Sequence, residues 1–399
     1  MRVLVASDKF KGTLTSAEVA AAVSDGVRRV RPDAVVDRVV VADGGDGTLA
    51  AAVAAGFSFV AVRATGPTGQ PVPTGYARRG DTAVVELADA SGLIRLPGGV
   101  LAPMTAGTRG TGELIAAAVE AGATRVILGI GGSASTDGGA GMLRALGARL
   151  LDASGTEVAD GGAALADVVS VDLEALAHLK DVEVIVACDV DNPLTGPKGA
   201  AATYGPQKGA SPQQIEQLDK ALTHWADLIA QATAPGASAL APFGADPGRS
   251  PAPEPHPELG SGSARLPFHQ IPGSGAAGGV GFAALAVLGA RLVPGIELVL
   301  ELVGFTERLA GVDLVVTGEG ALDDQTLHGK AVSGVASAAQ AAGVPVVAVC
   351  GTNRLDDRRL RAAGIEAAYA LTDLQPDVSR CIADPVPLLR GLGERIGLR

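Results

Sequence analysis

Short runs of β-branched and aliphatic residues alternate along the chain with alanine-rich segments long enough to form helices. This alternation is typical of βαβ units and predicts an α/β protein built on parallel strands. We expect strands at residues 3–6, 35–41, 126–128, 182–187, 314–316 and 344–349. Four of these strands run directly into polar, glycine-rich loops. Because ligands of open parallel sheets bind at the carboxyl ends of strands, the chemistry of this protein is expected in those loops.

The segments between the strands predict helices and connections. A helix is expected over residues 16–30, with Ser16 as its cap, and another is expected from Thr48. Residues 273–290 are mostly glycine and alanine, too weakly apolar for a membrane span, and predict a buried helix after a tight loop. The Pro/Gly-rich residues 65–74 predict a domain boundary. Residues 234–267 predict a mobile loop or a partly disordered insertion.

Composition narrows the class of protein. A chain of 399 residues suggests two or three domains at about 150 residues each. Hydrophobic residues make up 47% of the chain but aromatic residues only 3%, so the core must consist of Ala, Val, Leu and Ile. A net charge of −11 without a basic stripe argues against a nucleic-acid partner. A small anion could still be held by a few lysines and by helix N-termini.

Cysteine usage and the N-terminus predict a cytoplasmic protein without a membrane partner. Cys188, Cys350 and Cys381 are scattered and form no CxxC pattern, which favours a reducing compartment. Charges begin at Arg2, so the first residues do not form the apolar region of a secretion signal. We expect a monomer or a homodimer.

Two polar loops follow the first two predicted strands. In the first, Ser7-Asp-Lys-Phe-Lys-Gly-Thr, the side chains of Lys9 and Lys11 could hold an anionic oxygen; the alternative is a solvated loop before a capped helix. In the second, Ala42-Asp-Gly-Gly-Asp-Gly-Thr, Asp43 or Asp46 could bind Mg²⁺, which proteins hold through one or two carboxylates plus substrate phosphates. Ordinary Asp-Gly turn chemistry explains this second loop equally simply.

The stretch GIGGSASTDGGAG, residues 129–141, follows a predicted buried strand. Its Gly129-x-Gly131-x-x-Ala134 pattern, with Asp152 beyond it, matches a dinucleotide-binding fingerprint. A Rossmann helix would have to carry Gly138, Gly139 and Gly141 in its first turns, and each glycine there costs about 1 kcal/mol relative to alanine. No GK[ST] follows, so the stretch is not a Walker A loop. A long loop whose amides and hydroxyls face an anion, with a helix from about Met142, fits the residues better.

Two further loops carry several acids each. Asp189, Asp191 and Asn192 follow the strand at 182–187, with Lys198 and Lys208 on glycine-rich turns. A carboxylate with amide and ammonium groups nearby is typical of phosphoryl transfer, although an Asn-Pro turn also accounts for Asp191. After the strand at 314–316, three acids crowd one loop ahead of Lys330, and they would repel one another unless a metal or cation compensates. These acids are Glu319, Asp323 and Asp324.

Taken in order, six stretches closely resemble the motif series of bacterial glycerate kinases of the non-MOFRL type. They are DKFKGTL, VADGGDGT, GGSASTDGGAGML, DVDNPLTGPKGAAATYGPQKGA, PGSGAAGGVGFAAL and TGEGALDDQTLHGK. The resemblance implies ATP- and Mg²⁺-dependent phosphorylation of D-glycerate to 2-phosphoglycerate, or alternatively 3-phosphoglycerate, in organic acid and glyoxylate catabolism. It also implies two α/β domains with the active site in the cleft between them. Residues 1–65 and 290–399 would form a flavodoxin-like parallel sheet domain, and residues 66–289 an inserted α/β domain.

Under this resemblance we expect Asp189 to act as the general base, with Asp43 and Asp323 as metal or substrate ligands and Lys11 in a catalytic role. Asp189 itself is a further candidate metal ligand. The expected substrate and nucleotide contacts are Asp8, Lys9, Gly44, Gly45, Gly131, Gly132, Ser133, Ser135, Thr136, Asp137, Asn192, Lys208, Ser274, Gly275, Glu319 and Lys330. Where the family commonly has arginine after TGEG, this chain has Ala321, so an anion contact is absent there or is supplied by Arg265 or Lys330.

Two other classes of function remain open. The fingerprint that begins at Gly129 and Asp152 favour an NAD-dependent oxidoreductase acting on a small hydroxy acid. A non-catalytic binding protein for hydroxy acids is the third alternative.

Overall fold

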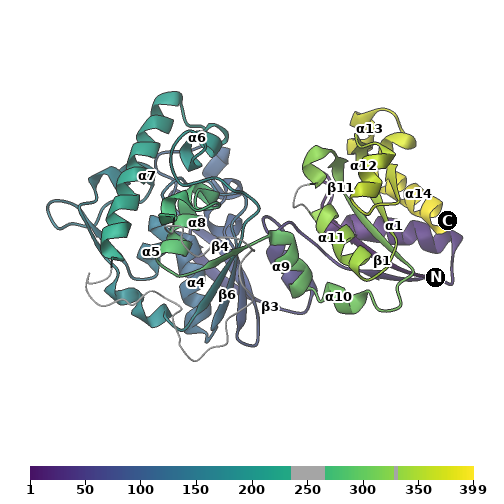
Figure 1. Cartoon of the computed structure of the whole chain (residues 1–399), viewed down its shortest axis with the longest axis horizontal. Coiled ribbons are helices and arrows are strands. Elements are labelled where there is room, and N and C mark those ends of the chain that lie inside the picture. The colour runs from purple at the N-terminus through teal and green to yellow at the C-terminus, as the bar shows by residue number, and fades with distance from the viewer. Residues whose placement is uncertain (235–265, 328–330) are drawn as a thin grey trace. The chain divides into compact units, whose positions relative to one another are not determined.

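The computed structural model describes residues 1–234, 266–327 and 331–399. Lys330, Arg265 and nearly all of the 234–267 segment lie outside the described residues. The chain divides into two compact units (Figure 1). Met1–Phe59 and Val293–Arg399 form the first, called the terminal unit here, and Val60–Leu292 forms the second, the central unit.

The terminal unit is built on a parallel sheet that both ends of the chain supply. Figure 1 shows the purple N-terminal and the yellow-green C-terminal segments in this one unit. The strands are β1 (Arg2–Ser7), β2 (Val35–Arg38), β11 (Leu314–Leu322), β12 (Val346–Asn353) and β13 (Ala367–Ala370). Their spatial order is β13-β12-β11-β1-β2, and the neighbouring pairs are parallel. Counted along the chain, this is the flavodoxin-like order 2-1-3-4-5, as the sequence predicted.

Helices cover both faces of this sheet, so its strands are apolar on both sides. Successive residues of β1 alternate between two apolar clusters: Val3 and Val5 pack with α1 and α14, and Leu4 and Ala6 pack with α9 and α11. The helices of this unit are α1 (Ser16–Val30), α2 (Thr48–Ala54), α9 (Gly295–Leu302), α10 (Phe305–Arg308), α11 (Ala331–Ala341), α12 (Asp357–Ala362), α13 (Val378–Ala383) and α14 (Pro385–Gly397).

The start of α1 differs from the expected cap. Thr15, not Ser16, is the N-cap, and it forms a reciprocal capping box with Glu18. The Ser16 hydroxyl instead donates to the Val41 carbonyl oxygen at 3.2 Å. The helix therefore begins where it was predicted, but one residue earlier in the chain supplies the cap.

The central unit holds a mixed sheet in the order β10-β9-β6-β5-β4-β3. The pairs of β5 with β6 and of β6 with β9 are parallel, whereas β4 and β5 are antiparallel. Residues 65–74 include the turn between β3 and β4, in which the Gly66 amide donates to the Gln70 carbonyl oxygen. The strands are β3 (Ser58–Thr65), β4 (Pro71–Arg79), β5 (Thr82–Glu86), β6 (Arg125–Gly129), β9 (Glu183–Ala187) and β10 (Arg291–Val293), and β7 (Arg149–Leu151) pairs separately with β8 (Ser170–Asp172).

Six α-helices of the described residues belong to this unit: α3 (Ala88–Ser91), α4 (Arg109–Glu120), α5 (Ala140–Ala145), α6 (Ala200–Tyr204), α7 (Pro212–Ala232) and α8 (Ala276–Ala286). The glycine- and alanine-rich α8 is buried, as predicted, but its first turn is not helical. Ala277, Gly278 and Gly279 have positive φ angles, so regular helix begins only after them. Across the described ranges, no helix combines the length and the apolar character that a membrane crossing requires.

Candidate active site

The terminal unit places its polar loops at the point where the strand order reverses. In a 2-1-3-4-5 sheet this point lies between the first and third strands, here β1 and β11, where ligands of such sheets bind. Ser7 is in register with Gly318, and the Asp8 amide donates to the Gly318 carbonyl oxygen at 2.8 Å. Asp8, directly after β1, therefore lies beside the part of β11 that carries Glu319, and β11 continues to Leu322.

Three carboxylates influence one another at this edge. Burial, followed by the charges of Asp43 and Glu319, raises the pKa of Asp8 to about 6, although Lys9 opposes the shift. Burial lowers the pKa of Lys9, but its hydrogen bond to Asp46 and the charges of Asp8, Asp46 and Asp43 raise that pKa above its ordinary value overall. The edge thus carries more negative charge than its lysine neutralises, which favours a cation there.

The loop after β2 holds Asp43 and Asp46 in different settings. The Asp46 carboxylate lies 3.0 Å from the Lys9 amino group, in an ion pair that leaves Asp46 largely exposed. One Asp43 oxygen accepts from the Gly45 amide at 3.2 Å, a contact within the Asp43-Gly44-Gly45 turn. The turn interpretation is therefore correct for the backbone, and it leaves the Asp43 carboxylate half-buried beside Asp8.

The loop after β11 joins two of the predicted acids through one buried hydroxyl. Thr326 donates to Glu319, and the Asp323 amide donates to the Thr326 hydroxyl at 2.9 Å. Asp324 instead points to Arg359 in an ion pair. Lys11 is exposed on the turn that bridges Phe10 and Leu14.

These carboxylates suit a magnesium ion that a phosphate also holds. Within the described residues no group of three Asp, Glu, His or Cys side chains is close enough to bind a metal by itself. Mg²⁺ usually needs only one or two carboxylates when substrate phosphates complete its coordination. The mutual repulsion of Asp8, Asp43 and Glu319 is the feature that such an ion would relieve.

The central unit brings together three of the six predicted motifs near the carboxyl ends of β6 and β9. Gly129 and Ala187 are in register at these strand ends, so the loops that follow leave the sheet together. The Gly138 amide donates to the Gly278 carbonyl oxygen at 2.9 Å, and the Gly275 amide donates to the Asn192 carbonyl oxygen at 2.9 Å. A side chain at Gly278 would bring its Cβ within 2.1 Å of the Ser135 carbonyl oxygen, so the loops touch through bare backbone.

Lys208 is the charged group at the centre of this arrangement. Its side chain is 2% exposed, and its amino group donates to the Ser133 hydroxyl at 2.8 Å and to the Ser135 carbonyl oxygen. The buried hydroxyls of Ser135 and Thr136 have no hydrogen-bond partner among the described residues. Burial lowers the pKa of Lys208 to about 7, and the Asp137 charge opposes this shift.

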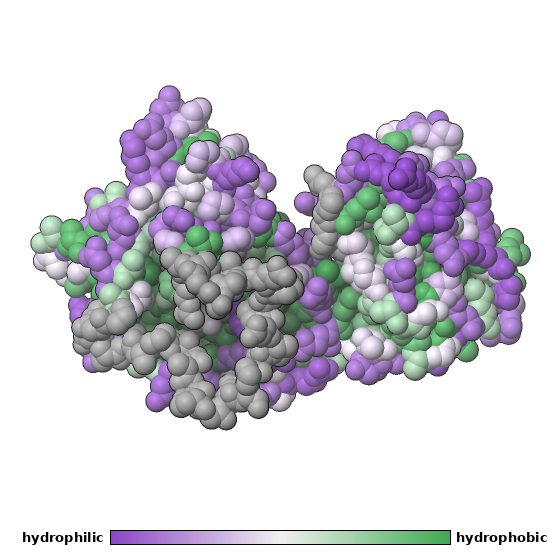
Figure 2. Space-filling view, in the orientation of Figure 1, coloured by the Kyte–Doolittle hydropathy of each residue, from purple (hydrophilic) through white to green (hydrophobic). Residues whose placement is uncertain are grey.

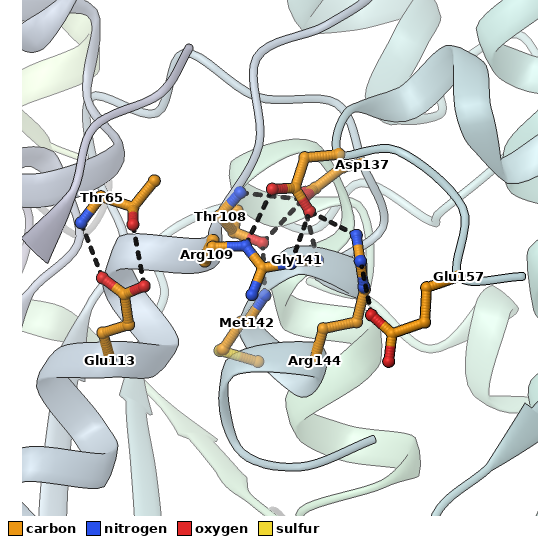
Figure 3. Close-up of polar contacts among 10 residues, drawn as sticks. Thr65, Thr108, Arg109, Glu113, Asp137, Gly141, Met142, Arg144 and Glu157 are labelled. Atoms are coloured by element: carbon orange, nitrogen blue, oxygen red, sulfur yellow. Dashed lines mark hydrogen bonds and ion pairs between the residues drawn. The ribbon is translucent and has the colours of Figure 1, made fainter. Parts of the chain in front are cut away.

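Asp137 organises the loop from the inside. Its fully buried carboxylate accepts from the Thr108 hydroxyl at 2.7 Å, the Thr108 amide at 2.9 Å and the Gly141 amide at 3.2 Å (Figure 3). It also accepts from the Gly139 amide at 3.2 Å. The Thr108 hydroxyl in turn accepts from the Met142 amide at 2.9 Å. Burial raises the pKa of Asp137, although these hydrogen bonds oppose it. Asp137 is one of the predicted substrate contacts, and in the structure its carboxylate joins the starts of α4 and α5.

The remaining predicted residues of the central unit range from exposed to buried. Asp189 and Asp191 are exposed after β9, while the Asn192 side chain donates to the Lys198 carbonyl oxygen and accepts from the Tyr204 hydroxyl. Ser274 is buried, and its hydroxyl donates a hydrogen bond to the His269 carbonyl oxygen at 3.1 Å. At the start of the loop, Gly131 is half-buried and Gly132 is exposed, with its carbonyl oxygen accepting from Leu93.

The dinucleotide fingerprint is not formed. The helix after β6 begins only at Ala140, not directly after the first glycine as a Rossmann turn requires. The Asp152 carboxylate is used within its own turn, where it accepts from the Ser154 amide at 2.8 Å and the Thr156 amide at 3.0 Å. The structure therefore removes the pattern that favoured an oxidoreductase.

Thr108, Thr326 and Trp225 contribute to these loops, yet no pattern in the sequence singles them out. Trp225 donates from its indole to the Gly138 carbonyl oxygen at 3.0 Å from the buried face of α7. Its helical spacing identifies it only as a core residue. Thr108 contacts Asp137 and Met142, which lie 29 and 34 residues away, so no local pattern indicates those contacts. Thr326 contacts Glu319 and Asp323 within its own loop and strand end.

The pH dependence of stability should reveal the buried charge of Lys208. Because its pKa is lower in the folded state, the charged form destabilises the fold below about pH 7, and this penalty is relieved as pH rises toward 10. Relative to Lys208→Met, the wild-type free energy of unfolding should rise by about 1 kcal/mol per pH unit in this window. Urea titrations followed by the fluorescence of Trp225, the single tryptophan, measure it. Parallel pH profiles for the two proteins would contradict this account of Lys208.

Both units thus present charged, glycine-rich loops at the carboxyl edges of parallel strands, which is typical of α/β proteins that bind small anionic ligands. The family model described as the glycerate kinase family matches residues 3–398. The chain belongs to this family, and the resemblance noted in its motifs is confirmed.

Relatives with high similarity carry matching names. The glycerate kinase of Bacillus subtilis (strain 168) is 44% identical over 93% of this chain and 90% of its own length. The glycerate 2-kinase of Escherichia coli (strain K12) is 41% identical over 93% and 90%. A crystal structure from Salmonella typhimurium LT2, of a protein assigned as glycerate kinase 2, matches with a TM-score of 0.79 and 38% identity, covering 100% of this chain and 97% of that one.

Proposed function

We propose that this protein transfers the γ-phosphoryl group of ATP to the 2-hydroxyl of D-glycerate, with Mg²⁺ as the metal. The family match across residues 3–398 is the observation that carries the proposal. The name glycerate 2-kinase, borne by a relative 41% identical over 93% of the chain, favours the 2-position over the 3-position.

The reaction exchanges one oxygen–phosphorus bond for another. The glycerate hydroxyl oxygen bonds to the γ-phosphorus as the bond from that phosphorus to the β–γ bridging oxygen breaks. ADP leaves with the bonding electrons, and the hydroxyl proton passes to a base. Since the transition state is loose, the protein acts mainly by positioning its ligands and by neutralising charge.

The acids and lysines of the terminal unit suit the phosphate and metal. Asp43, with Asp323 or Glu319, would hold Mg²⁺, which when bound neutralises phosphate charge. Lys9 and the exposed Lys11 would neutralise phosphate oxygens, and Lys9 is already oriented by Asp46. The raised pKa of Asp8 supports a cation at this edge, because a cation would favour the ionised carboxylate.

The loops of the central unit suit an anionic ligand and the reacting hydroxyl. The GGSAST loop offers backbone amides and hydroxyls, with Lys208 beneath it. An anion held there would raise the pKa of Lys208 and keep its amino group charged. Asp189 is exposed at the end of β9, which supports its role as the base that orients the glycerate hydroxyl.

Release of ADP tests the function as a whole. Purified protein with ATP, Mg²⁺ and D-glycerate should release ADP in step with glycerate consumption. Other small hydroxy acids should support a lower kcat/KM, and NAD should neither bind nor be reduced. Failure to release ADP with any member of the hydroxy-acid panel would defeat the kinase proposal.

The magnesium requirement should depend on Asp43. Asp43→Asn should raise the Mg²⁺ concentration for half-maximal activity at least about tenfold, because an amide is a much weaker ligand for Mg²⁺ than a carboxylate. Asp46→Asn is the matched control on the same turn, since Lys9 engages the Asp46 carboxylate, and its Mg²⁺ requirement should stay within about twofold of wild type. Equal requirements in both variants would remove Asp43 from the metal site.

A further inference from the structure

A cavity of about 310 Å³ opens within the terminal unit at the carboxyl ends of β11 and β12. Gly320 and Ala321 at the end of β11 and Gly351 and Thr352 at the end of β12 line one side. Phe10 joins them from the loop that follows β1. The cavity therefore lies at the ligand-binding edge of the 2-1-3-4-5 sheet, next to its switch point.

The lining of this cavity is mainly apolar. Leu371, Cys381 and Phe10 are buried side chains that face it, whereas Val378 and Ile382 on α13 border it while 46% and 58% exposed. Val378 and Ile382 are four residues apart, so they share one face of the helix. By contrast, the surface over α12 is strongly hydrophilic (Figure 2), and Arg358, Arg359 and Arg361 are exposed there.

Lys11 is the charged residue that lines the cavity. It belongs to the loop after β1, which connects the cavity to the acidic edge of the sheet. Two residues earlier the same loop carries Lys9, and before it Asp8, whose carboxylate interacts with Asp43 and Glu319. The apolar cavity thus adjoins the loop that carries Asp8, Lys9 and Lys11.

We propose that this cavity binds the purine base of the phosphoryl donor. A flat, largely apolar ring fits a chamber with an aromatic wall and backbone groups at strand ends, and its volume lies at the lower end of the range for ligand pockets. A phosphate chain attached to that base would extend past Lys11 toward Lys9 and the acidic edge. Glycerate, a small anion with two hydroxyls, would leave its polar groups unpaired among these side chains. The inference rests on the proposed kinase function.

Ala321 contributes only a methyl group to the cavity wall, so a larger side chain at this position would reduce the volume of the cavity. Ala321→Leu would fill the space that the base needs. Val378→Asp would place a charge at the rim, and since Val378 is already 46% exposed the fold should tolerate it. Val35→Asp is the matched control: Val35 belongs to the same unit, is 56% exposed and does not line this cavity.

Calorimetric titration with MgADP tests the inference without turnover. Ala321→Leu and Val378→Asp should each weaken ADP binding at least about tenfold, while Val35→Asp stays within about twofold of wild type. Inorganic tripolyphosphate, which lacks the base, should bind wild type and all variants alike. The KM for D-glycerate at saturating ATP should also be unchanged, and circular dichroism checks that each variant is folded.

The outcomes separate the two proposals. Unchanged ADP affinity in both folded cavity variants, with an active wild-type kinase, would overturn the assignment of the cavity alone. Loss of tripolyphosphate binding in step with ADP would overturn it as well, because the variants would then act on phosphate and not on the base. A wild-type protein without kinase activity would instead defeat the proposed function.

Discussion

Replacing Asp189 with asparagine is expected to lower kcat for D-glycerate phosphorylation by about a thousandfold, the typical contribution of a positioned general base. Asparagine keeps the size of the side chain but cannot accept the hydroxyl proton. Asp189 is exposed at the end of β9, so the thermal stability of the variant should match wild type. Steady-state kinetics by coupled ADP detection, with both KM values determined, measures the effect.

Asp191 provides the matched control for this variant. It is an exposed carboxylate on the same loop, two residues further on. Asp191→Asn should retain kcat within about threefold, because the loss of a solvated charge near a site changes little. Near-normal kcat in Asp189→Asn would show that another group takes the proton, and the assignment of Asp189 as base would then be wrong.

Replacing Asp137 with alanine is expected to lower the free energy of unfolding by about 4 kcal/mol, because buried donors at the starts of α4 and α5 would lose their acceptor. These donors are the Thr108 hydroxyl and the amides of Thr108, Gly139 and Gly141. Urea unfolding followed by Trp225 reports on this loop directly, since the indole of Trp225 donates to the Gly138 carbonyl oxygen.

Asp152→Ala is the control that distinguishes the effect of burial on the free energy of unfolding from the effect of the number of hydrogen bonds. Asp152 also accepts several hydrogen bonds, from Ser154 and Thr156, but it does so on the exposed surface of a turn. Water can replace its carboxylate, so the variant should lose less than about 1 kcal/mol. If Asp137→Ala cost as little as Asp152→Ala, the structural role of Asp137 would be contradicted.

The pattern of apolar runs predicted several inner strands but missed β5, an inner strand that is also buried. β1, β6, β9 and β12 are buried on both faces, so their sequences are continuous apolar runs that alternate with helices. β3 and β4 were not predicted, because exposed residues interrupt their apolar runs, as Phe59 and Arg63 do in β3. The glycine-rich turn at residues 65–74 joins the end of β3 to the start of β4. The composition of that turn predicts a domain boundary and suits a turn between strands equally well. The division between the two units lies nearby, between Phe59 and Val60.

The sequence located the loops that carry charge, but it did not predict which residues in them are buried. Asp137 and Asp189 both follow strands of one sheet in polar, glycine-rich contexts. The first is fully buried because Thr108 lies beside it, and that contact joins residues 29 positions apart. Similarly, nothing local indicates that Lys208 reaches Ser133 across 75 residues. Burial of polar side chains depends on such distant pairings, which hydrophobic periodicity does not encode.

Phosphorus NMR of the reaction product tests the central claim most directly. The wild-type protein, incubated with ATP, Mg²⁺ and D-glycerate, should yield ADP and one phosphomonoester. If the phosphoryl group is on the 2-hydroxyl, its phosphorus couples to the single proton on C2, the carbon that carries the phosphorylated oxygen, and gives a doublet. A triplet, from the two protons of the terminal carbon, would contradict the 2-position, and the absence of any phosphomonoester signal would contradict glycerate kinase activity itself.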